Sequence, residues 1–256
     1  MAKKTQIRKS AVRFKTDVDA LLHFTTTATQ GVSDEYQSWI YDGAIIRLYR
    51  LFEKLMLEAL VGAINNDTTT VSATLGVKFP KHLTDEACQY LVIGSGYFDF
   101  KGRDGLLQIL KEFVPSGKVK TETKEKRKSK KTKTAKLATP ATPAAPIKHY
   151  LVTIIEKAIY KPYLDQLSAL RNFAAHESTK SRNAVLKATN QARIKSSGAW
   201  LKRTPAGKKQ RRFDELCDRL KTIASEIETN APAIKTRKPA AKAGVRSSTA
   251  VSVTKK

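Results

Sequence analysis

Apolar residues recur at steps of three and four along most of this 256-residue chain, which is the period of an amphipathic helix. The longest such stretch starts at Ser33, a good N-cap followed by carboxylates, and stops at Asn65. Trp39 falls on its apolar stripe and is therefore expected in the core. We predict one long helix over residues 33–64, with a stripe made of Trp39, Ile40, Ala44, Ile45, Leu48, Tyr49, Phe52, Leu55, Met56, Ala59, Leu60, Ala63 and Ile64.

Shorter stretches show the same period and carry helix-starting or helix-ending residues. Thr84 is a good N-cap, Gly94 and Gly96 close that stretch, and Pro162 suits the first turn of a later one. Almost nothing alternates with period two, as a half-buried strand would. We therefore predict an all-α fold, a helical bundle, with further helices over residues 84–93, 104–114, 149–160, 162–175, 182–194 and 211–228.

The net charge of +25, from 48 basic and 23 acidic residues, is concentrated in segments. Residues 1–15 carry +6, residues 118–136 carry +8 and residues 229–256 carry +7, while residues 180–212 hold eleven basic residues and no acid. The remaining helical body has a net charge of −7. Such segments usually bind a polyanion, nucleic acid first and an anionic membrane second. The alternative is that they are only solvated, solubilising tails.

Two of these basic segments lie in stretches that cannot form a core. Residues 116–147 pass from a lysine run into LATPATPAAP, and residues 230–256 have a similar Lys-Ala-Pro composition. Neither buries enough apolar surface to offset its ordering entropy, so we predict a disordered linker and a disordered tail. We also predict a disordered basic arm over residues 1–15. The helices on both sides of the linker are expected to form one domain over residues 16–229, with two separate domains as the weaker alternative.

Composition also predicts where the protein works. Apolar residues make up 41% of the chain, enough for a sizeable core, but no apolar run is long enough to span a bilayer. The first residues are polar and basic, unlike a secretory signal. Two cysteines, Cys88 and Cys217, cannot form a disulfide framework, which favours a reducing compartment. We expect a soluble cytoplasmic protein without a membrane partner; the string KEKRKSKKTK at 124–133 leaves nuclear or nucleoid association open.

Several catalytic signatures are absent. The GSG string at 94–96 lacks the third glycine of a dinucleotide-binding turn, because Asp99 stands in its place, and no phosphate-binding Walker loop occurs. We therefore expect no cofactor. A metal is not expected either, because no metal-ligand spacing relates the four histidines, His23, His82, His149 and His176.

The candidate chemistry lies in the string LRNFAAHES, residues 170–178. Asn172 and His176 are four residues apart and share one face of a continuous helix. Arg171 is five residues from His176, about 140° around the helix, so its side chain must reach around or the helix must break. A histidine transfers protons near neutral pH and an arginine neutralises charge on a phosphate, so these groups suit metal-free phosphodiester chemistry. The structural alternative is an arginine paired with a carboxylate and a histidine that caps the helix end.

Basic residues beside this string and in the linker are candidate nucleic-acid contacts. Contacts between basic side chains and phosphates give binding that is salt-dependent and independent of sequence. Trp200 is expected in the core, with base stacking as the alternative. The candidate contacts are Lys180, Arg182, Lys187, Arg193, Lys195, Lys202 and Arg203 after the string, and Lys126, Arg127, Lys128, Lys130 and Lys131 in the linker.

The string at 171–176 resembles the defining motif of the HEPN superfamily: an arginine, a polar residue, three to five further residues and a histidine. The all-helical body, the long helix that carries Glu53 and the segment YFDFKGRDGLL look most like the branch often labelled RiboL-PSP-HEPN. The resemblance covers roughly residues 33–114 and 148–229, and the basic tails lie outside it.

This resemblance implies a metal-independent endoribonuclease that works as a homodimer, with the motifs of two subunits facing one cleft. It implies that His176 acts on the 2′-hydroxyl or the leaving group, that Arg171 holds the scissile phosphate and that Asn172 positions both. Cleavage through the 2′-hydroxyl leaves a cyclic phosphate and selects RNA over DNA. Members of this kind occur in toxin–antitoxin and anti-phage defence systems, so an antitoxin or another regulatory protein is a further expected partner. One branch has a modified regulatory tyrosine two residues after the histidine, where this chain has Ser178.

Two other functions stay open at this point. The first is a non-catalytic helical dimer that binds nucleic acid through its basic tails, with an inactive HEPN scaffold. The second is a helical interaction or regulatory module whose basic regions serve only solubility or targeting. RNA cleavage that depends on Arg171 and His176 separates the enzyme from both.

Overall fold

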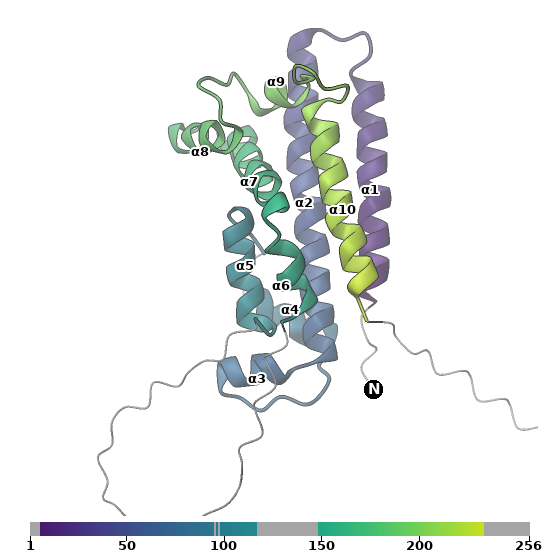
Figure 1. Ribbon diagram of the computed structural model, residues 1–256, viewed down its shortest axis with the longest axis vertical. Helices are drawn as coiled ribbons and strands as arrows, with labels where there is room; N and C mark the ends of the chain where they lie inside the picture. Colours follow the sequence, from purple (N-terminus) through teal and green to yellow (C-terminus); the bar gives the residue numbers. More distant parts are fainter. Residues whose placement is uncertain (1–5, 95, 97, 117–147, 233–256) are drawn as a thin grey trace, which may run out of the picture.

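The computed structural model describes residues 6–94, 96, 98–116 and 148–232, and within these ranges the chain is all-α, as predicted (Figure 1). No β-strand occurs in them, only one antiparallel bridge between Ser116 and Lys148. The helices are α1 Ile7–Ala28, α2 Asp34–Asn66, α3 Thr69–Leu75, α4 Asp85–Ile93, α5 Gly102–Phe113, α6 Tyr150–Ile155, η1 Ala158–Tyr160 (a 3₁₀ turn), α7 Lys161–His176, α8 Thr179–Thr189, α9 Ser197–Leu201 and α10 Arg212–Asn230.

The central helix is α2, which begins and ends within two residues of the predicted span. The Ser33 hydroxyl accepts a hydrogen bond from the first turn and so caps the helix as the sequence indicates. Figure 1 shows α1, α2 and α10 as three long helices side by side, while α7, α9 and α4 pack on other faces of α2. Aromatic pairs join the three long helices: Phe52 of α2 meets Phe14 of α1, with ring centroids 5.9 Å apart. Tyr41 of α2 meets Phe213 of α10 at 5.3 Å.

The predicted disordered arm over residues 1–15 is wrong for residues 7–15, which form the first turns of α1. Apolar residues recur there at steps of three and four, and the resulting stripe is buried against α2 and α10. The high positive charge hides this period when the segment is judged by composition. The buried stripe consists of Ile7, Ala11, Phe14, Val18 and Leu21.

The basic residues of α1 also serve the fold. The Arg8 guanidinium donates to the Ala231 carbonyl at 2.8 Å and so ties the start of α1 to the end of α10. Lys15 pairs with Glu228 of α10 at 2.6 Å, and Arg13 pairs with a glutamate of α2. These cations therefore hold neighbouring helices rather than forming a free arm.

Other predicted helices occur with shifted ends. Thr84 caps α4, as predicted. The predicted helix over 149–160 is split into α6 and η1, because Lys157 adopts an extended conformation between them. The predicted helix over 182–194 is shifted toward the N-terminus, since Ser178 caps α8 and Asn190 ends it in the left-handed region (φ 51°). The predicted helices do not include α1 or the short helices α3 and α9.

The prediction of Trp39 in the core is wrong, since this side chain is 60% exposed. The neighbouring face of α2 is covered by α9, whose backbone approaches so closely that a Cβ on Gly198 would lie 1.8 Å from the Ser38 carbonyl oxygen. The Gly198 N–H also donates to the Asp42 carboxylate at 2.6 Å. Trp39 lies to the side of this contact. Trp200 of α9, in contrast, is partly buried and packs against the core.

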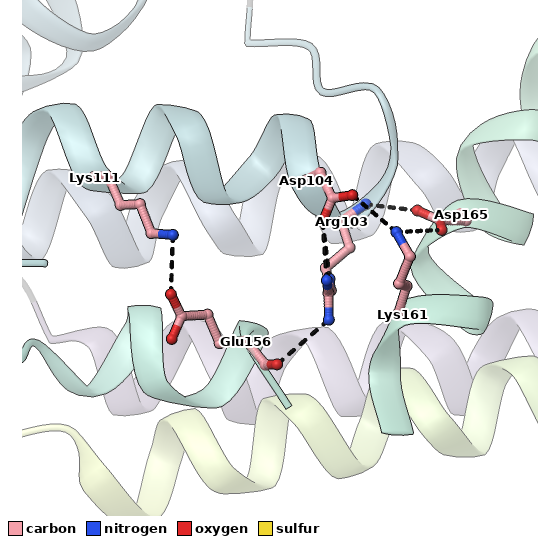
Figure 2. Close-up of polar contacts among 6 residues, drawn as sticks. All are labelled: Arg103, Asp104, Lys111, Glu156, Lys161 and Asp165. Atoms are coloured by element: carbon pink, nitrogen blue, oxygen red, sulfur yellow. Dashed lines mark hydrogen bonds and ion pairs between the residues drawn. The ribbon is translucent and has the colours of Figure 1, made fainter. Parts of the chain in front are cut away.

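Ion pairs join α5, α6 and α7 into one face of the molecule (Figure 2). Lys161 of α7 bridges Asp104 of α5 at 2.8 Å and Asp165 of its own helix at 3.2 Å, while Lys111 of α5 pairs with Glu156 at 2.9 Å. The Asp165 carboxylate also accepts a hydrogen bond from the backbone N–H of Arg103. This last contact requires glycine at 102, where φ is +68° and a Cβ would lie 2.5 Å from the Asp165 oxygen. The loop before α5 is thereby fixed against α7.

The described residues on either side of 117–147 lie together, because the His149 N–H donates to the Pro115 carbonyl at 2.8 Å beside the Ser116–Lys148 bridge. The predicted disorder falls outside the described residues for 117–147 and 233–256, whereas Asn230 still belongs to α10 and Ala231 is buried. The linker candidates for nucleic-acid contact also fall outside the described residues: Lys126, Arg127, Lys128, Lys130 and Lys131. Among the described helices, none combines the length and the apolarity needed to cross a membrane.

Candidate functional site

The string that carries the candidate chemistry lies at the end of α7, and the helix does not break within it. Helix α7 continues through His176, and the chain turns only at Glu177, whose φ is 43° and whose N–H donates to the Phe173 carbonyl. Ser178 then caps α8. Of the two arrangements that the spacing allows, the structure has the continuous helix, so Arg171 and His176 point in directions about 140° apart.

Arg171 is held between its own helix and α2. Its Nη1 donates to the Asn172 Oδ1 at 2.7 Å, and its guanidinium carbon lies 4.9 Å from the centroid of the Tyr49 ring. A guanidinium stacked on an aromatic face keeps N–H donors at its edge for a planar or tetrahedral anion. The motif arginine is therefore oriented by Asn172 beside it and by a tyrosine far away in the sequence.

Tyr49 is fixed in turn by the loop that precedes α5. Its hydroxyl donates to the Asp99 Oδ1 at 2.6 Å and accepts a hydrogen bond from the Phe100 N–H at 3.3 Å. The Phe100 ring stacks on the Tyr49 ring with centroids 5.0 Å apart. Burial and the hydrogen bond to Asp99 raise the pKa of Tyr49 well above its usual range, so it stays a neutral donor.

A second carboxylate, Glu53, lies one turn beyond Tyr49 on α2. Burial, and then the negative charge of Asp99, raise the pKa of Glu53 to about 7, while Arg171 and Arg50 oppose this rise. The side chains of Tyr49, Glu53, Asp99, Arg171 and Asn172 form one group, which we call the Arg171 cluster. It combines one cation with two acids, one of which changes its charge near neutral pH.

His176 lies outside this cluster. Its side chain is exposed, and in the described part of the chain no hydrogen bond joins it to Arg171 or Asn172. Burial chiefly, and then the charge of Glu177 after α7, raise the pKa of Asp42 on α2. The structure thus brings Arg171 and Asn172 together and leaves His176 free at the helix end, one turn from Asn172.

The basic stretch after the string surrounds this end of α7. Its candidate contacts are exposed on α8, in the connection to α9 and after α9, namely Lys180, Arg182, Lys187, Arg193, Lys195 and Arg203. Lys202 differs, because its side chain is only 8% exposed and its ammonium pairs with the Asp34 carboxylate at 2.5 Å. Lys202 therefore ties α9 to the start of α2, while the other six cations face solvent.

The sequence interpretation misses Tyr49 and Asp99 as members of the site. Tyr49 belongs to the apolar stripe of the long helix and looks like an ordinary core residue. Asp99 carries a weak signal, since it is an acid between Phe98 and Phe100, both of which are buried. Because Asp99 itself is exposed, this pattern does not by itself predict its hydrogen bond to the buried Tyr49.

Neither a metal site nor a comparison with known proteins identifies the function of the Arg171 cluster. Among the described residues, no group of three His, Cys, Asp or Glu side chains is placed to hold a metal ion. No family model, no curated protein and no solved structure matches the chain. The class defined by the fold is an all-α protein with a polar cluster between α2, α7 and the loop before α5.

Proposed function

We propose that the protein is a metal-independent endoribonuclease of the HEPN type that cleaves RNA through the 2′-hydroxyl. The observation that carries this proposal is the orientation of Arg171, which is bonded to Asn172 and stacked on Tyr49, with His176 one turn further along the same helix. The exposed cations on α8 and in the segments before and after α9 supply the charge that an RNA substrate needs.

The reaction needs two proton transfers and one site of charge neutralisation. Arg171 would bind the scissile phosphate through its free N–H donors and offset the charge that develops on its oxygens. The 2′-oxygen attacks the adjacent phosphorus while an imidazole takes its proton, and the 5′-oxygen leaves with a proton from an acid. The products are a 2′,3′-cyclic phosphate and a 5′-hydroxyl. DNA lacks the nucleophile and would not be cleaved.

A homodimer fits the directions of these side chains. Within one subunit Arg171 points toward α2, while His176 lies about 140° around the helix and five residues further on. A phosphate held by one Arg171 would then meet the imidazole of the second subunit more readily than that of its own. A toxin or defence role, with an antitoxin or other protein as regulator, belongs to the same proposal.

The test is cleavage of structured RNA in excess EDTA. Arg171→Ala and His176→Ala should each abolish it, while the matched controls Arg13→Ala and His23→Ala, both on α1 and away from the cluster, should retain it. Cleavage that survives in Arg171→Ala and His176→Ala, or an inactive wild type, would contradict the proposal.

A second candidate is nucleic-acid binding without cleavage, with the helical body as an inactive scaffold. It is favoured by the exposed His176, which no hydrogen bond joins to Arg171 or Asn172 in the described structure, and by the six exposed cations of the basic stretch. RNA binding that is strong at low salt, without cleavage under any of the conditions above, is the result that this candidate predicts.

A further inference from the structure

Two aromatic side chains stand exposed together at the start of α2. Tyr36 is 53% exposed and Trp39 is 60% exposed, and their ring centroids are 5.1 Å apart with an angle of 56° between the ring planes. The cap at Ser33 and the helix hold both residues on rigid backbone. Adjacent large aromatics left in water indicate a surface that binds something.

A cation is held at the start of α2, the part of the helix that carries this aromatic pair. Lys202 pairs with the Asp34 carboxylate in the first turn of α2 at 2.5 Å, and Arg203 follows Lys202 in the chain. The hydrogen bond and charge of Lys202, and then the charges of Arg203 and Lys195, lower the pKa of Asp34. Lys202 neutralises Asp34, whereas Arg203 and Lys195 are exposed. Aromatic faces flanked by such cations are what single-stranded nucleic acid requires, because its bases stack and its phosphates need positive charge.

Trp39 lies on the same side of α2 as Arg50 and, less closely, Glu53 of the Arg171 cluster, whereas Tyr49 lies about 80° around the helix from Trp39. At 100° per residue, Arg50 lies within about 20° of the direction of Trp39, and Glu53 lies within about 40°. Arg50 is exposed, and a Cβ on Gly43, one turn after Trp39, would meet nothing within 4 Å. The distance along the helix from Trp39 to Tyr49, under the Arg171 guanidinium, is about 15 Å, which a strand of a few nucleotides spans.

We infer that Tyr36 and Trp39 form a stacking platform for a base of single-stranded RNA. The phosphates next to that base contact Lys195 and Arg203, and the strand follows α2 past Arg50 toward Arg171. The part of this inference that makes the strand a substrate rests on the proposed ribonuclease function, but the binding of the strand does not.

A second copy of the chain fits this surface less well than RNA does. Two aromatic rings bury about 300–500 Å² at most, well below the roughly 800 Å² per partner of a stable interface. The exposed side chains that follow on this face are Arg47 and Arg50. A two-fold interface centred there would bring like charges together.

The experiment measures binding of a short 2′-O-methyl oligoadenylate, which lacks the 2′-hydroxyl nucleophile and so cannot be cleaved. Trp39→Ala and Tyr36→Ala should each weaken binding by about 5- to 150-fold, the range of one stacked base. The matched control is Tyr90→Ala, which removes a tyrosine that is 68% exposed. Tyr90 lies on α4, away from the platform at the start of α2, so binding should not change. Glu35→Gln, which removes the remaining acid of the first turn, should tighten binding.

Salt dependence and fluorescence identify the contact. Arg203→Ala should reduce the log–log salt slope by about 0.7, whereas Trp39→Ala should lower affinity without changing the slope. The oligonucleotide should quench the fluorescence of the wild type, and this quenching should disappear in Trp39→Phe, which retains Trp200.

Unchanged affinity in Trp39→Ala, or quenching that persists in Trp39→Phe, would overturn the inference. Dissociation of a dimer on Trp39→Ala, measured by light scattering, would overturn it too, because it would make a second copy the occupant. The two proposals fail separately. Binding that depends on Trp39, without cleavage of natural RNA, would contradict the ribonuclease and support the stacking platform. Cleavage of RNA that does not depend on Trp39 would contradict the platform and support the ribonuclease.

Discussion

The guanidinium of Arg171 lies over the ring of Tyr49, 4.9 Å from its centroid, and this contact joins the end of α7 to the middle of α2. The hydroxyl of the same tyrosine holds Asp99 at 2.6 Å. One core residue thus positions both the cation of the candidate site and an acid beside it. The geometry of Arg171 depends on α2 and on the loop before α5 as much as on its own helix.

Removing only the hydroxyl of Tyr49 tests this dependence. Tyr49→Phe keeps the ring under Arg171 but leaves Asp99 and the Phe100 N–H without their partner, so the free energy of unfolding should fall by about 1–2 kcal/mol. Urea denaturation measures it. Tyr36→Phe, on the exposed surface, should leave stability unchanged. Equal stability of Tyr49→Phe and the wild type would mean that these hydrogen bonds are replaced by water.

The raised pKa of Glu53 predicts a pH-dependent gain from Glu53→Gln. Since its pKa rises from 4.5 to about 7 on folding, the folded protein binds the proton more tightly than the unfolded chain. The stability from the protonated form is fully present below pH 4.5 and is lost as the pH rises through about 7. At pH 8, Glu53→Gln should therefore raise the free energy of unfolding by about 1–2 kcal/mol, discounted for partial exposure.

At pH 4 the same substitution should give little or no gain, because Glu53 is then protonated in both states. Denaturation curves at the two pH values make the comparison, with the exposed Glu86→Gln on α4 as the matched control. A gain from Glu53→Gln that is equal at both pH values would contradict the assigned titration.

Burial of α1 predicts that its first turns contribute to stability. Phe14→Ala removes a buried ring that meets Phe52 and should cost about 3–5 kcal/mol in thermal or urea unfolding. Val12→Ala, in the same turn but exposed, should cost less than about 0.5 kcal/mol. Small and similar effects of both substitutions on stability would contradict the burial of α1 and support a disordered arm over residues 1–15.

Replacing Gly198 of α9 and Gly43 of α2 with alanine should change the stability of the protein in opposite directions. Gly198→Ala would place its Cβ 1.8 Å from the Ser38 oxygen and should destabilise the protein by about 1–3 kcal/mol through overpacking. Gly43→Ala, in open space on α2, should stabilise it by about 0.5–1 kcal/mol because alanine favours the helix. The unfolding temperatures of the two variants measure these changes in stability. Stabilisation by Gly198→Ala would mean that α9 does not approach α2 this closely.

Local signals predict the parts of the fold that depend on neighbouring residues. The long helix, its cap at Ser33 and the cap at Thr84 follow from period and residue type alone. The whole of α1 is missed, and charge dominates the composition of its start, although Ile7, Ala11 and Phe14 keep the helical period. Trp39 is misplaced because an apolar stripe does not indicate which part of it another helix will cover.

The site shows the same limit. The pairing of Arg171 with Asn172 lies within two residues and fits the motif. Its contact with Tyr49, and the contact of Tyr49 with Asp99, join residues at least fifty positions apart, which the periodicity of the sequence does not predict. The direction of His176 depends on where α7 ends, which Glu177 sets through a left-handed conformation that its residue type does not favour.

The most direct test of the account is the chemistry at the ends of RNA fragments produced in excess EDTA. Mass spectrometry of the products should show 2′,3′-cyclic phosphates and 5′-hydroxyls, formed by the wild type and absent with Arg171→Ala and His176→Ala. Fragments that end in 3′-hydroxyls and 5′-phosphates, or no fragments from the wild type, would contradict the assignment of a 2′-hydroxyl-dependent ribonuclease.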